Sequence, residues 1–581
     1  MKIIDLVLTD LDKPKKINKR TFYLSDWINI NNVDKKKLIS KPFKNYKDKI
    51  KGYRYLNRFR IVVENKFANY LYLHHNKNYS KILLKNVSSL WVGQYLQFIY
   101  IRWLITDQVI KQKDKINISD INIDEEINNY LDALDFMDLA FENDAFNYFH
   151  IKKIFNFRKK DFKKKIIFKK KKLYIKKTFV QRDTNKKLLI KTISFLQKFF
   201  EKILLPFTKK NRVFLKEGFS YKNLLFLNLR LYQIPFFGDQ VFNWYQVRKK
   251  FKPFKDYKLN ALKIHKKSPN NFEKYIFENI IEDAPSIYFN NLSEVSNLAE
   301  KILLNPKIII SSHSHFYNEL FKIWAFKRKI EKKSKLLIFQ HGGNHSNLNP
   351  VFDYEKKVST EFFDWRYNKK KLSGMTKYLN YNIKRKKNEE ILFIGIENRK
   401  YPCRIYPGLL HHDEMKSIEH FQYLSKGLGL KHKKNLFYIP NRTILPKHKK
   451  EILKTVNKKQ ILKNLTLKQN LKNFSLVICS SPMTTFFDSI LSGPTVLLIE
   501  KEYWMTNKKI EKKYELLKKN KILFYNVNDL IKHLKTIYPK NIHNWWNSKD
   551  VSSAVNQFLR EFNYEGNNRK FESEILKKLS N

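Results

Sequence analysis

The chain has 581 residues, and its 116 Lys and Arg against 54 Asp and Glu give a formal net charge of +62. Hydrophobic residues make up 43% of the chain and aromatic residues 15%, which excludes a disordered polyelectrolyte. A chain of this length is expected to form more than one compact unit. It holds only two cysteines, so we expect neither a disulfide framework nor a zinc site.

The positive charge favours anionic partners but does not by itself indicate nucleic acid. Lys greatly outnumbers Arg, and Asn and Ile are abundant, as codon bias in an AT-rich genome would produce. Nucleic-acid readers rely on Arg for bidentate contacts. The basic residues are spread along the chain, with one denser block from Lys152 to Lys210. We therefore expect an anionic membrane surface rather than nucleic acid as partner, the alternative for the block being a solvated, lysine-rich insertion.

The first elements are two short strands that each end at an acidic residue. Ile3–Leu8 and Thr21–Leu24 are predicted strands, and Asp10 and Asp26 follow their ends. Residues 55–150 are predicted to be mostly helical, with helical spacing over Ile121–Ala145. A basic, helical insertion is expected at about 150–215.

No segment has the features of a leader peptide or a membrane span. The N-terminal residues lack the apolar core and cleavage site of a signal peptide. The most apolar stretch, Leu90–Ile110, contains Gln94, Gln97, Arg102 and Asp107, so we expect a buried or surface-docked helix there. The prediction is a cytoplasmic protein held peripherally at the inner face of the membrane.

From residue 287 onward, strands and helices alternate regularly. This alternation predicts an α/β fold with two doubly wound parallel lobes, an N-terminal lobe at 1–385 and a C-terminal lobe at 386–581, joined through a charged connection at 369–390. Neither a P-loop nor a GxGxxG fingerprint is present. The predicted strands are Lys307–Ser311, Leu336–Phe339, Ile391–Ile396, Asn435–Ile439, Leu476–Cys479, Thr495–Ile499 and Ile522–Tyr525.

The segment KLLIFQHGGNHSN is the most informative part of the chain. A buried strand stops at Gln340-His341-Gly342-Gly343, and its two glycines let the backbone approach a ligand closely. Ligands of open α/β sheets lie just beyond the carboxyl ends of the strands, where this turn falls. His313 follows the preceding strand in the same way. The alternative is an ordinary strand-end turn that happens to contain His.

The C-terminal lobe has a second strand-end signal. Ser480-Ser481 follow a buried strand, and a helix is expected to start near Thr484-Thr485 with Asp488 in its first turns. Hydroxyl groups at such a position suit a phosphate, and a carboxylate one turn further suits ribose hydroxyls. Plain N-capping is the alternative. Arg side chains that could clamp a diphosphate follow two other strands of this lobe, in the loop with Arg399, Tyr401 and Arg404 and at Arg442.

These motifs, in this order, resemble a family of transferases associated with O-antigen and other surface-polysaccharide biosynthesis. The likeness spans nearly the whole chain except the basic block. The chain departs from the family pattern at Gly343-Asn344-His345 and at Asp488, where the family usually has Glu. The matching elements are Leu8-Thr9-Asp10-Leu11, Phe22 to Trp27, Trp91 with Tyr100 to Trp103, QHGG, Glu361 to Trp365, Arg399 to Arg404, Thr484 to Asp488 and Trp545-Trp546.

The resemblance implies a GT-B-like fold with two Rossmann-like lobes. Its C-terminal lobe would hold a nucleotide-sugar as co-substrate and its N-terminal lobe a glycan acceptor, with no metal and no other cofactor. Gln340, Gly342 and Gly343 would belong to the donor site, and His341 would stabilise the departing phosphate. Asp10, Asp26 and His313 are the candidates for the base that deprotonates the acceptor.

Three other functions remain open from the sequence. A CDP-polyol phosphotransferase has a similar two-lobed fold and an HG turn. A nucleic-acid-binding protein would account for the charge, although no recognised RNA or DNA module is present. A non-catalytic scaffold of an assembly machinery would bind no nucleotide.

Overall fold

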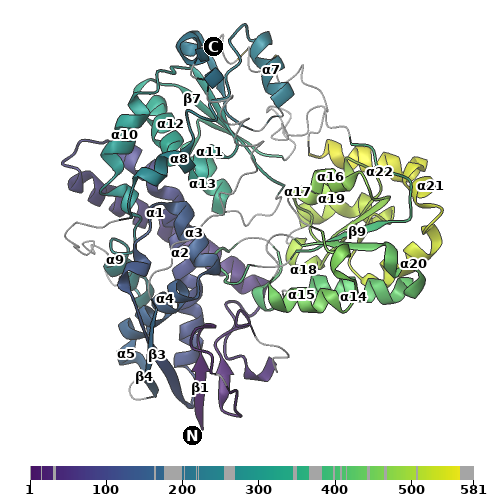
Figure 1. Cartoon of the computed structure of the whole chain (residues 1–581), viewed down its shortest axis with the longest axis horizontal. Coiled ribbons are helices and arrows are strands. Elements are labelled where there is room, and N and C mark those ends of the chain that lie inside the picture. Colours follow the sequence, from purple (N-terminus) through teal and green to yellow (C-terminus); the bar gives the residue numbers. More distant parts are fainter. Residues whose placement is uncertain are drawn as a thin grey trace.

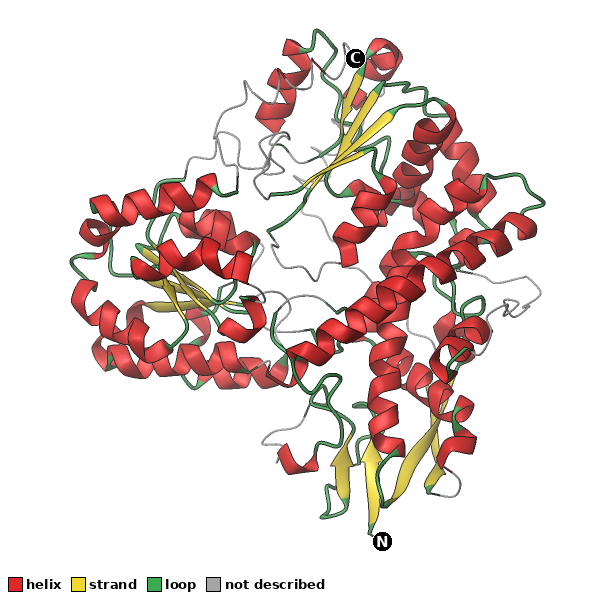
Figure 2. Ribbon diagram, turned by 180° about the vertical axis from the view of Figure 1, so that it is seen from behind, coloured by secondary structure: helices red, strands yellow, loops and turns green. Residues whose placement is uncertain are grey.

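Three parallel β-sheets form the three corners of the molecule (Figures 1 and 2). The protein is represented by a computed structural model. It describes residues 2–562 and the single residues 573 and 577, except for 15, 30–34, 163–164, 176–198, 202, 218, 220, 254–268, 344–349, 366–382, 397–398, 406–407, 414, 441–444, 463–466 and 506–507.

The first sheet, sheet A, is built by the N-terminal residues. Its four strands lie in the order β2-β1-β3-β4 and are all parallel. The chain thus winds from β1 to one side and then to the other, as predicted for a doubly wound sheet. The strands are β1 Ile3–Val7, β2 Thr21–Tyr23, β3 Lys115–Ile123 and β4 Ile166–Ile175.

Two sequence predictions fail in sheet A. The expected helix over Ile121–Ala145 is wrong at its start, because β3 extends to Ile123 and α3 begins at Ala133. The expected helical insertion is wrong over Ile166–Ile175, which is the edge strand β4. A run of lysines suits an edge strand, since charge there discourages pairing with other chains. Residues 176–198 of the basic block lie outside the described residues.

A long helical hairpin connects sheet A to the rest of the molecule. Helices α1 (Tyr46–His74) and α2 (Lys81–Ile110) pack against each other along their length. Most side chains of α2 are buried, because α3 (Ala133–Glu142), α4 (Asp144–Phe157) and α12 (Glu319–Glu331) also contact it. Among the described residues, no helix combines the length and apolarity needed to cross a bilayer.

Sheet B is separate from sheet A, whereas the sequence analysis placed its strands β6 and β7 in one N-terminal lobe with the first strands. Its strands run β5-β6-β7-β8 in chain order, and all pairs are parallel. The strand β7 is the one that ends in QHGG. The elements of this region are β5 Val213–Leu215, α7 Tyr221–Arg230, α10 Leu292–Glu300, β6 Ile308–Ser311, α11 Ser314–Tyr317, β7 Lys335–Phe339, α13 Pro350–Val358 and β8 Glu361–Phe363.

Sheet C belongs to the C-terminal lobe and has the order β10-β9-β11-β12-β13, again all parallel. This confirms the predicted doubly wound sheet there. Its strands are β9 Ile391–Ile394, β10 Leu436–Ile439, β11 Leu476–Cys479, β12 Thr495–Leu498 and β13 Leu523–Phe524. Its helices are α14 Lys416–Leu428, α15 Pro446–Leu453, α16 Leu467–Leu471, α17 Thr484–Ile490, α18 Lys501–Trp504, α19 Lys508–Lys519, α20 Val527–Ile537, α21 Ile542–Asn547 and α22 Lys549–Arg560.

Candidate functional site

The carboxyl ends of strands from all three sheets meet. Lys400, after β9, places its Nζ 2.6 Å from a carboxylate oxygen of Asp10, after β1. The backbone N–H of Gly343, after β7, donates to Thr484 Oγ1, after β11, at 2.8 Å. Arg404 donates to the hydroxyl of Tyr317, which ends the short helix after β6. We call this region the junction.

The order of the strands identifies two positions at the junction as places for a ligand. In sheet C the chain reverses direction between β9 and β11, and in sheet A it reverses between β1 and β3. Doubly wound sheets bind ligands at such a reversal, outside the carboxyl ends of the strands. The loop after β9 and the turn after β1 lie at these two positions, and the contact between Lys400 and Asp10 brings them together.

Hydrogen bonds between Trp365 and Gln340 hold the QHGG turn in place. The backbone N–H of Trp365 donates to Gln340 Oε1 at 2.9 Å, and its indole N–H donates to Gln340 O at 3.0 Å. Gln340 is buried, and its side chain bonds within the turn. A Cβ added to Gly343 would lie 2.9 Å from the Trp365 ring and 3.0 Å from Thr484 N. Only glycine therefore allows this approach of β7 to sheet C.

His341 and His313 form an exposed pair at the ends of β7 and β6. Their ring centroids are 4.8 Å apart, and both side chains reach solvent. Glu217 holds the turn of His313 by accepting its backbone N–H at 2.9 Å. By contrast, His315 is fully buried with Glu355 3.0 Å from its Nε2. Burial lowers the pKa of His315 and raises that of Glu355, so this inner pair is structural.

Hydroxyl groups near the start of α17, the predicted phosphate site, have partners within the protein. The Thr484 hydroxyl already accepts the Gly343 N–H, and α17 spans only seven residues. Ser480 is buried and donates to Ile394 O at 2.7 Å, which ties β11 to β9. Ser481 and Asp488 are buried and Thr485 is half-buried. The hydroxyl of Thr484 thus joins sheets B and C, and that of Ser480 joins two strands of sheet C.

The loop after β9 brings positive charge to the junction. Arg399 lies over the ring of Phe141 at 4.5 Å and 3.5 Å from a carboxylate oxygen of Glu142. Arg404 lies over the same ring at 5.5 Å. Tyr401 is buried, and its hydroxyl donates to Asp144 at 2.6 Å, so it anchors the loop. The fourth predicted donor residue of this kind, Arg442, lies outside the described residues.

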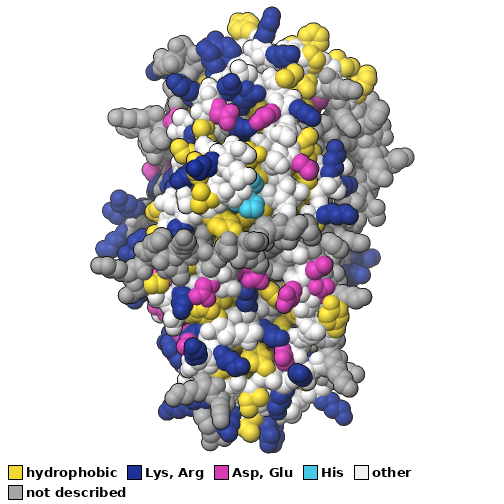
Figure 3. Space-filling model, turned by 90° about the vertical axis from the view of Figure 1, so that its left-hand side faces the viewer, with side chains coloured by type: hydrophobic (Ala, Val, Ile, Leu, Met, Phe, Trp, Pro, Cys, Tyr) yellow, Lys and Arg dark blue, Asp and Glu magenta, His cyan; other side chains and the backbone are white. Residues whose placement is uncertain are grey.

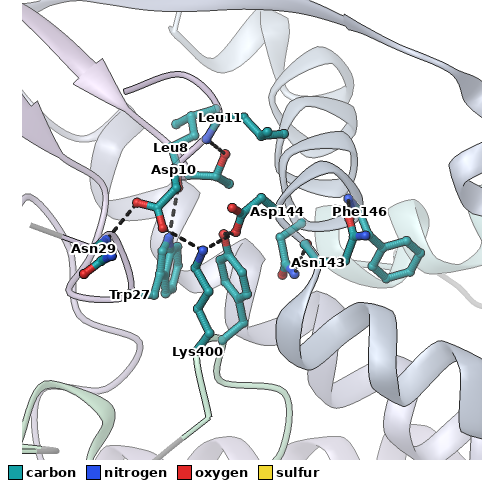
Figure 4. A network of polar contacts seen from close by, with 12 residues as sticks. Leu8, Asp10, Leu11, Trp27, Asn29, Asn143, Asp144, Phe146 and Lys400 are labelled. Atoms are coloured by element: carbon teal, nitrogen blue, oxygen red, sulfur yellow. Dashed lines mark hydrogen bonds and ion pairs between the residues drawn. The ribbon is translucent and has the colours of Figure 1, made fainter. Parts of the chain in front are cut away.

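Asp10 takes part in a polar network that spans the junction (Figure 4). One of its oxygens accepts the backbone N–H of Asn29 at 2.8 Å. Lys400 Nζ lies 2.6 Å from the other oxygen and 2.6 Å from a carboxylate oxygen of Asp144. Burial lowers the pKa of Lys400, but the two carboxylates outweigh it and the pKa is raised. The lysine is therefore a fixed cation between two carboxylates.

Asp12 and Trp27 hold the turn that carries Asp10. The carboxylate of Asp12 accepts the backbone N–H groups of Leu8 and Thr9, each at 2.7 Å. Burial raises the pKa of Asp12 to about 7 against the lowering effect of these donors. The indole of Trp27 donates to Leu8 O at 2.9 Å. The two parts of the N-terminal motif are thus bonded to each other.

Asp26 takes part in a separate group of contacts between sheet A and the C-terminal lobe. His411 Nδ1 is 2.6 Å from its Oδ1, and Lys447 Nζ donates to its backbone carbonyl at 2.6 Å. Burial raises the pKa of Asp26, but His411 and Lys447 outweigh it and the pKa is lowered. A carboxylate that binds protons so weakly is a poor base near neutral pH. This weakens the hypothesis that Asp26 deprotonates the acceptor.

Sequence reasoning missed the residues that support the loop after β9. Arg102, in the middle of α2, donates to Pro402 O and to Asn147 Oδ1. Gln97 accepts the backbone N–H of Ile405 at 2.8 Å. The available signal was the presence of polar side chains in an otherwise apolar helix, since such groups need partners when buried.

Among the described residues, no group of three or more His, Cys, Asp or Glu is arranged to hold a metal ion.

Two solved structures are similar over part of the chain. TarM is 14% identical, with a TM-score of 0.30 over 50% of this chain and 59% of its own. The chain thus spans about three fifths of TarM. A protein described as a UDP-N-acetylglucosamine 2-epimerase from Listeria monocytogenes is 10% identical, with a TM-score of 0.31 over 60% of this chain and 94% of its own. At these scores neither likeness carries an argument about activity.

No curated protein matches the chain. A family model does, and its match extends from residue 4 to residue 579. That range contains the reversals of sheets A and C, the QHGG turn and the loop after β9. Because the model described as LIC12162 family transferase covers nearly the whole chain, this protein belongs to that family of transferases.

Proposed function

We propose that this transferase is a glycosyltransferase that moves a sugar from a nucleotide-sugar to a growing cell-surface polysaccharide. The observation that carries the proposal is the meeting of two doubly wound sheets at their reversal positions, with Lys400 of one bonded to Asp10 of the other. Such an arrangement suits two substrates, one on each sheet. The proposal places the protein in the cytoplasm at the inner face of the membrane.

The C-terminal side of the junction suits an anionic donor. Arg399, Lys400 and Arg404 lie on the loop after β9, and His341 lies on the turn after β7. Arg399 is only 28% exposed and its partner Glu142 is 42% exposed, at a separation of 3.5 Å. A diphosphate would replace that loose carboxylate contact with shorter, charge-assisted bonds. In this proposal the nucleotide-sugar is the co-substrate, and no cofactor or metal takes part.

The two exposed imidazoles suit the transfer step. In the proposed reaction the acceptor oxygen forms a bond to the anomeric carbon as the bond from that carbon to the diphosphate oxygen breaks. His313 takes the proton of the acceptor hydroxyl, and His341 donates a hydrogen bond to the departing diphosphate. Among the three candidate bases, His313 is the best placed, because Asp10 is bound to Lys400 and Asp26 to His411.

Replacing His341 tests this assignment. The change His341→Ala is expected to lower the transfer rate by about 100-fold or more, the range for one lost acid–base or charge-stabilising group. Transfer would be measured by mass spectrometry of the glycan product. His432→Ala is the matched control, because His432 packs against Tyr538 at 4.9 Å beside helix α20. Full activity of His341→Ala would overturn the role of His341.

The class of donor needs its own experiment. Thermal unfolding with a panel of nucleotide-sugars and CDP-polyols would show which ligand stabilises the protein. Stabilisation by a nucleotide-sugar alone is the expected result. Stabilisation by a CDP-polyol alone would replace this proposal with a polyol-phosphate transferase, and stabilisation by neither would favour a scaffold.

A further inference from the structure

Helix α7 carries large apolar side chains on its outer face. Tyr221, Leu225 and Leu229 recur at every fourth position, and their side chains are 59%, 42% and 53% exposed. Phe226 is exposed beside them, and Tyr232, just after the helix, is 97% exposed. A soluble helix normally buries such residues, so an outward apolar face of this kind indicates a surface that something else covers.

The orientation of α7 is fixed by its inner face. Leu224 and Leu227 pack into the core on one side of sheet B. The buried Asn228 donates to Leu224 O at 2.7 Å and accepts from Gln233 Nε2 at 2.7 Å. The helix therefore buries satisfied amide groups while it exposes larger apolar ones. Rotating it to bury the outer face would expose Leu224 and Leu227 and break the bond between Asn228 and Gln233.

A second apolar segment lies beside α7. The turn at Asp239 links this segment to α7. The backbone N–H of Asp239 donates to Glu201 of the segment at 2.7 Å, and its side chain accepts from the Tyr221 hydroxyl of α7 at 3.1 Å. Both segments belong to the sheet B corner of the molecule (Figure 1). Exposed hydrophobic side chains gather at that end of the face shown in Figure 3. The exposed apolar residues of the second segment are Phe199, Phe200, Ile203 and Phe207.

The charge around this surface is positive. The carboxylate of Glu201 accepts three backbone N–H groups, and Asp239 lies 2.7 Å from Lys216 Nζ. These two acids are thus already bonded within the protein, and α7 itself contains no acidic residue. Exposed basic side chains flank the apolar ones, at Lys209, Lys210, Lys222 and Arg230.

We propose that α7 and the described residues 199–201 and 203–210 form a docking surface for an anionic lipid bilayer. Apolar side chains ringed by basic ones enter the boundary between headgroups and acyl chains, while the basic groups bind lipid phosphates. A second copy of the chain would instead bring like charges together. The inference deepens the membrane part of the proposed function and does not depend on sugar transfer.

Vesicle binding tests the surface. Full-length protein would be sedimented with vesicles of phosphatidylcholine alone and of phosphatidylcholine with phosphatidylglycerol. Wild type is expected to bind the anionic vesicles, and Leu225→Gln/Leu229→Gln to bind them at least about tenfold more weakly. Ile61→Gln/Leu73→Gln is the matched control, because both residues are 57% exposed on α1, outside this surface. All these side chains are at the surface, so the variants should fold.

Two further measurements separate the contribution of charge to vesicle binding from the insertion of side chains into the bilayer. Lys209→Gln/Lys210→Gln/Lys222→Gln is expected to weaken binding to anionic vesicles by about fivefold per lysine. Tyr232→Cys can carry an environment-sensitive dye selectively, because both native cysteines are buried. Its emission should shift to the blue on anionic vesicles, as it would on entering an apolar layer.

The outcomes distinguish this inference from the proposed function. Absent wild-type binding to anionic vesicles, or equal binding by the α7 variant, would overturn it. So would a wild-type dimer that the α7 variant converts to a monomer, because a second copy would then be the occupant. Turnover of the donor with a soluble acceptor, without vesicles, should be the same in wild type and the variants. Its absence in all of them would count against glycosyl transfer and leave the docking surface standing.

Discussion

The contacts that join the C-terminal lobe to the rest of the molecule include two kinds of different physical nature. Toward sheet B, the backbone of Gly343 packs directly against Thr484 and the ring of Trp365. Toward sheet A, the contacts include the ion pair of Lys400 with Asp10 and the bond between His411 and the carboxylate of Asp26. The first contact is steric and fixes a distance. The second is electrostatic, so pH, salt and bound anions can change it.

This difference suits a transferase that must admit an anionic substrate. A close-packed contact keeps His341 in a constant position relative to sheet C. The basic groups of the loop after β9 are held by carboxylates of the N-terminal lobe, Asp10, Glu142 and Asp144. An arriving diphosphate can compete with those carboxylates for the same cations. Donor binding would then loosen the electrostatic contact and leave the steric one unchanged.

The strongest way to break the steric contact is Gly343→Ala. The new Cβ would lie 3.0 Å from Thr484 N and 3.1 Å from the Met483 carbonyl carbon, both backbone atoms that cannot rotate away. We expect activity to fall by about 100-fold as the QHGG turn is displaced. The free energy of unfolding should fall by about 1–3 kcal/mol from overpacking. Steady-state kinetics and thermal unfolding would measure the two effects.

Gly342→Ala is the control for that change. Its Cβ would meet only the Thr484 side-chain oxygen, at 2.8 Å, and a side chain can move. The loss should therefore be smaller than for Gly343→Ala. If the two variants lose activity equally, the close approach at Gly343 is not what positions the turn.

The electrostatic contact is broken by Lys400→Met. The change keeps the length of the side chain but leaves the carboxylates of Asp10 and Asp144 without their shared cation. We expect a loss of about 1–3 kcal/mol in the free energy of unfolding. Salt should reduce the difference from wild type, which chemical denaturation at about 0.05 M and about 0.5 M ionic strength would show.

Lys454→Met is the matched control for the lysine. It removes an exposed ion pair with Glu451 in which the lysine side chain is 56% exposed. Exposed pairs contribute at most about 1 kcal/mol. An equal cost for the two lysines would show that the Lys400 contact is an ordinary surface pair.

The strands at the junction could be predicted from the sequence because each is a short apolar run with a polar stop. Leu476–Cys479 has the predicted bounds, and the strand before QHGG differs by one residue at its start. The strand ends also pointed to His341, His313, Asp10 and Asp26, which the structure places just after β7, β6, β1 and β2. The sequence did not predict which of these polar residues bond within the protein. Gln340, Tyr401 and Ser480 are buried, and a sequence does not show which polar side chains bond inward.

The third sheet was missed for a different reason. β5 and β8 are three residues long and carry no periodicity that distinguishes a strand from a turn.

The polar residues of the apolar helix α2 served in the sequence analysis mainly as evidence against a membrane span. In the structure, Gln94 donates to Tyr317 and Arg102 to the loop after β9. A buried polar residue in an apolar run is thus a signal of a tertiary bond whose partner the sequence does not name.

The smallest expected effect sharpens the electrostatic contact through its dependence on pH. Asp26→Asn keeps an oxygen that can accept from His411, so the cost near neutral pH should be about 1 kcal/mol.

The folded-state pKa of Asp26 is lowered below its ordinary value, so the stability from its ionised form is present above that ordinary value of about 3.9. That stability is lost as the pH falls through the folded-state pKa. The difference between wild type and variant should therefore close progressively as the pH falls below about 4. Asp550→Asn, at an exposed carboxylate, should show no such closing gap in denaturation curves across this range. If the difference in stability between wild type and Asp26→Asn is unchanged at pH 3, the contact of Asp26 with His411 depends on shape rather than charge.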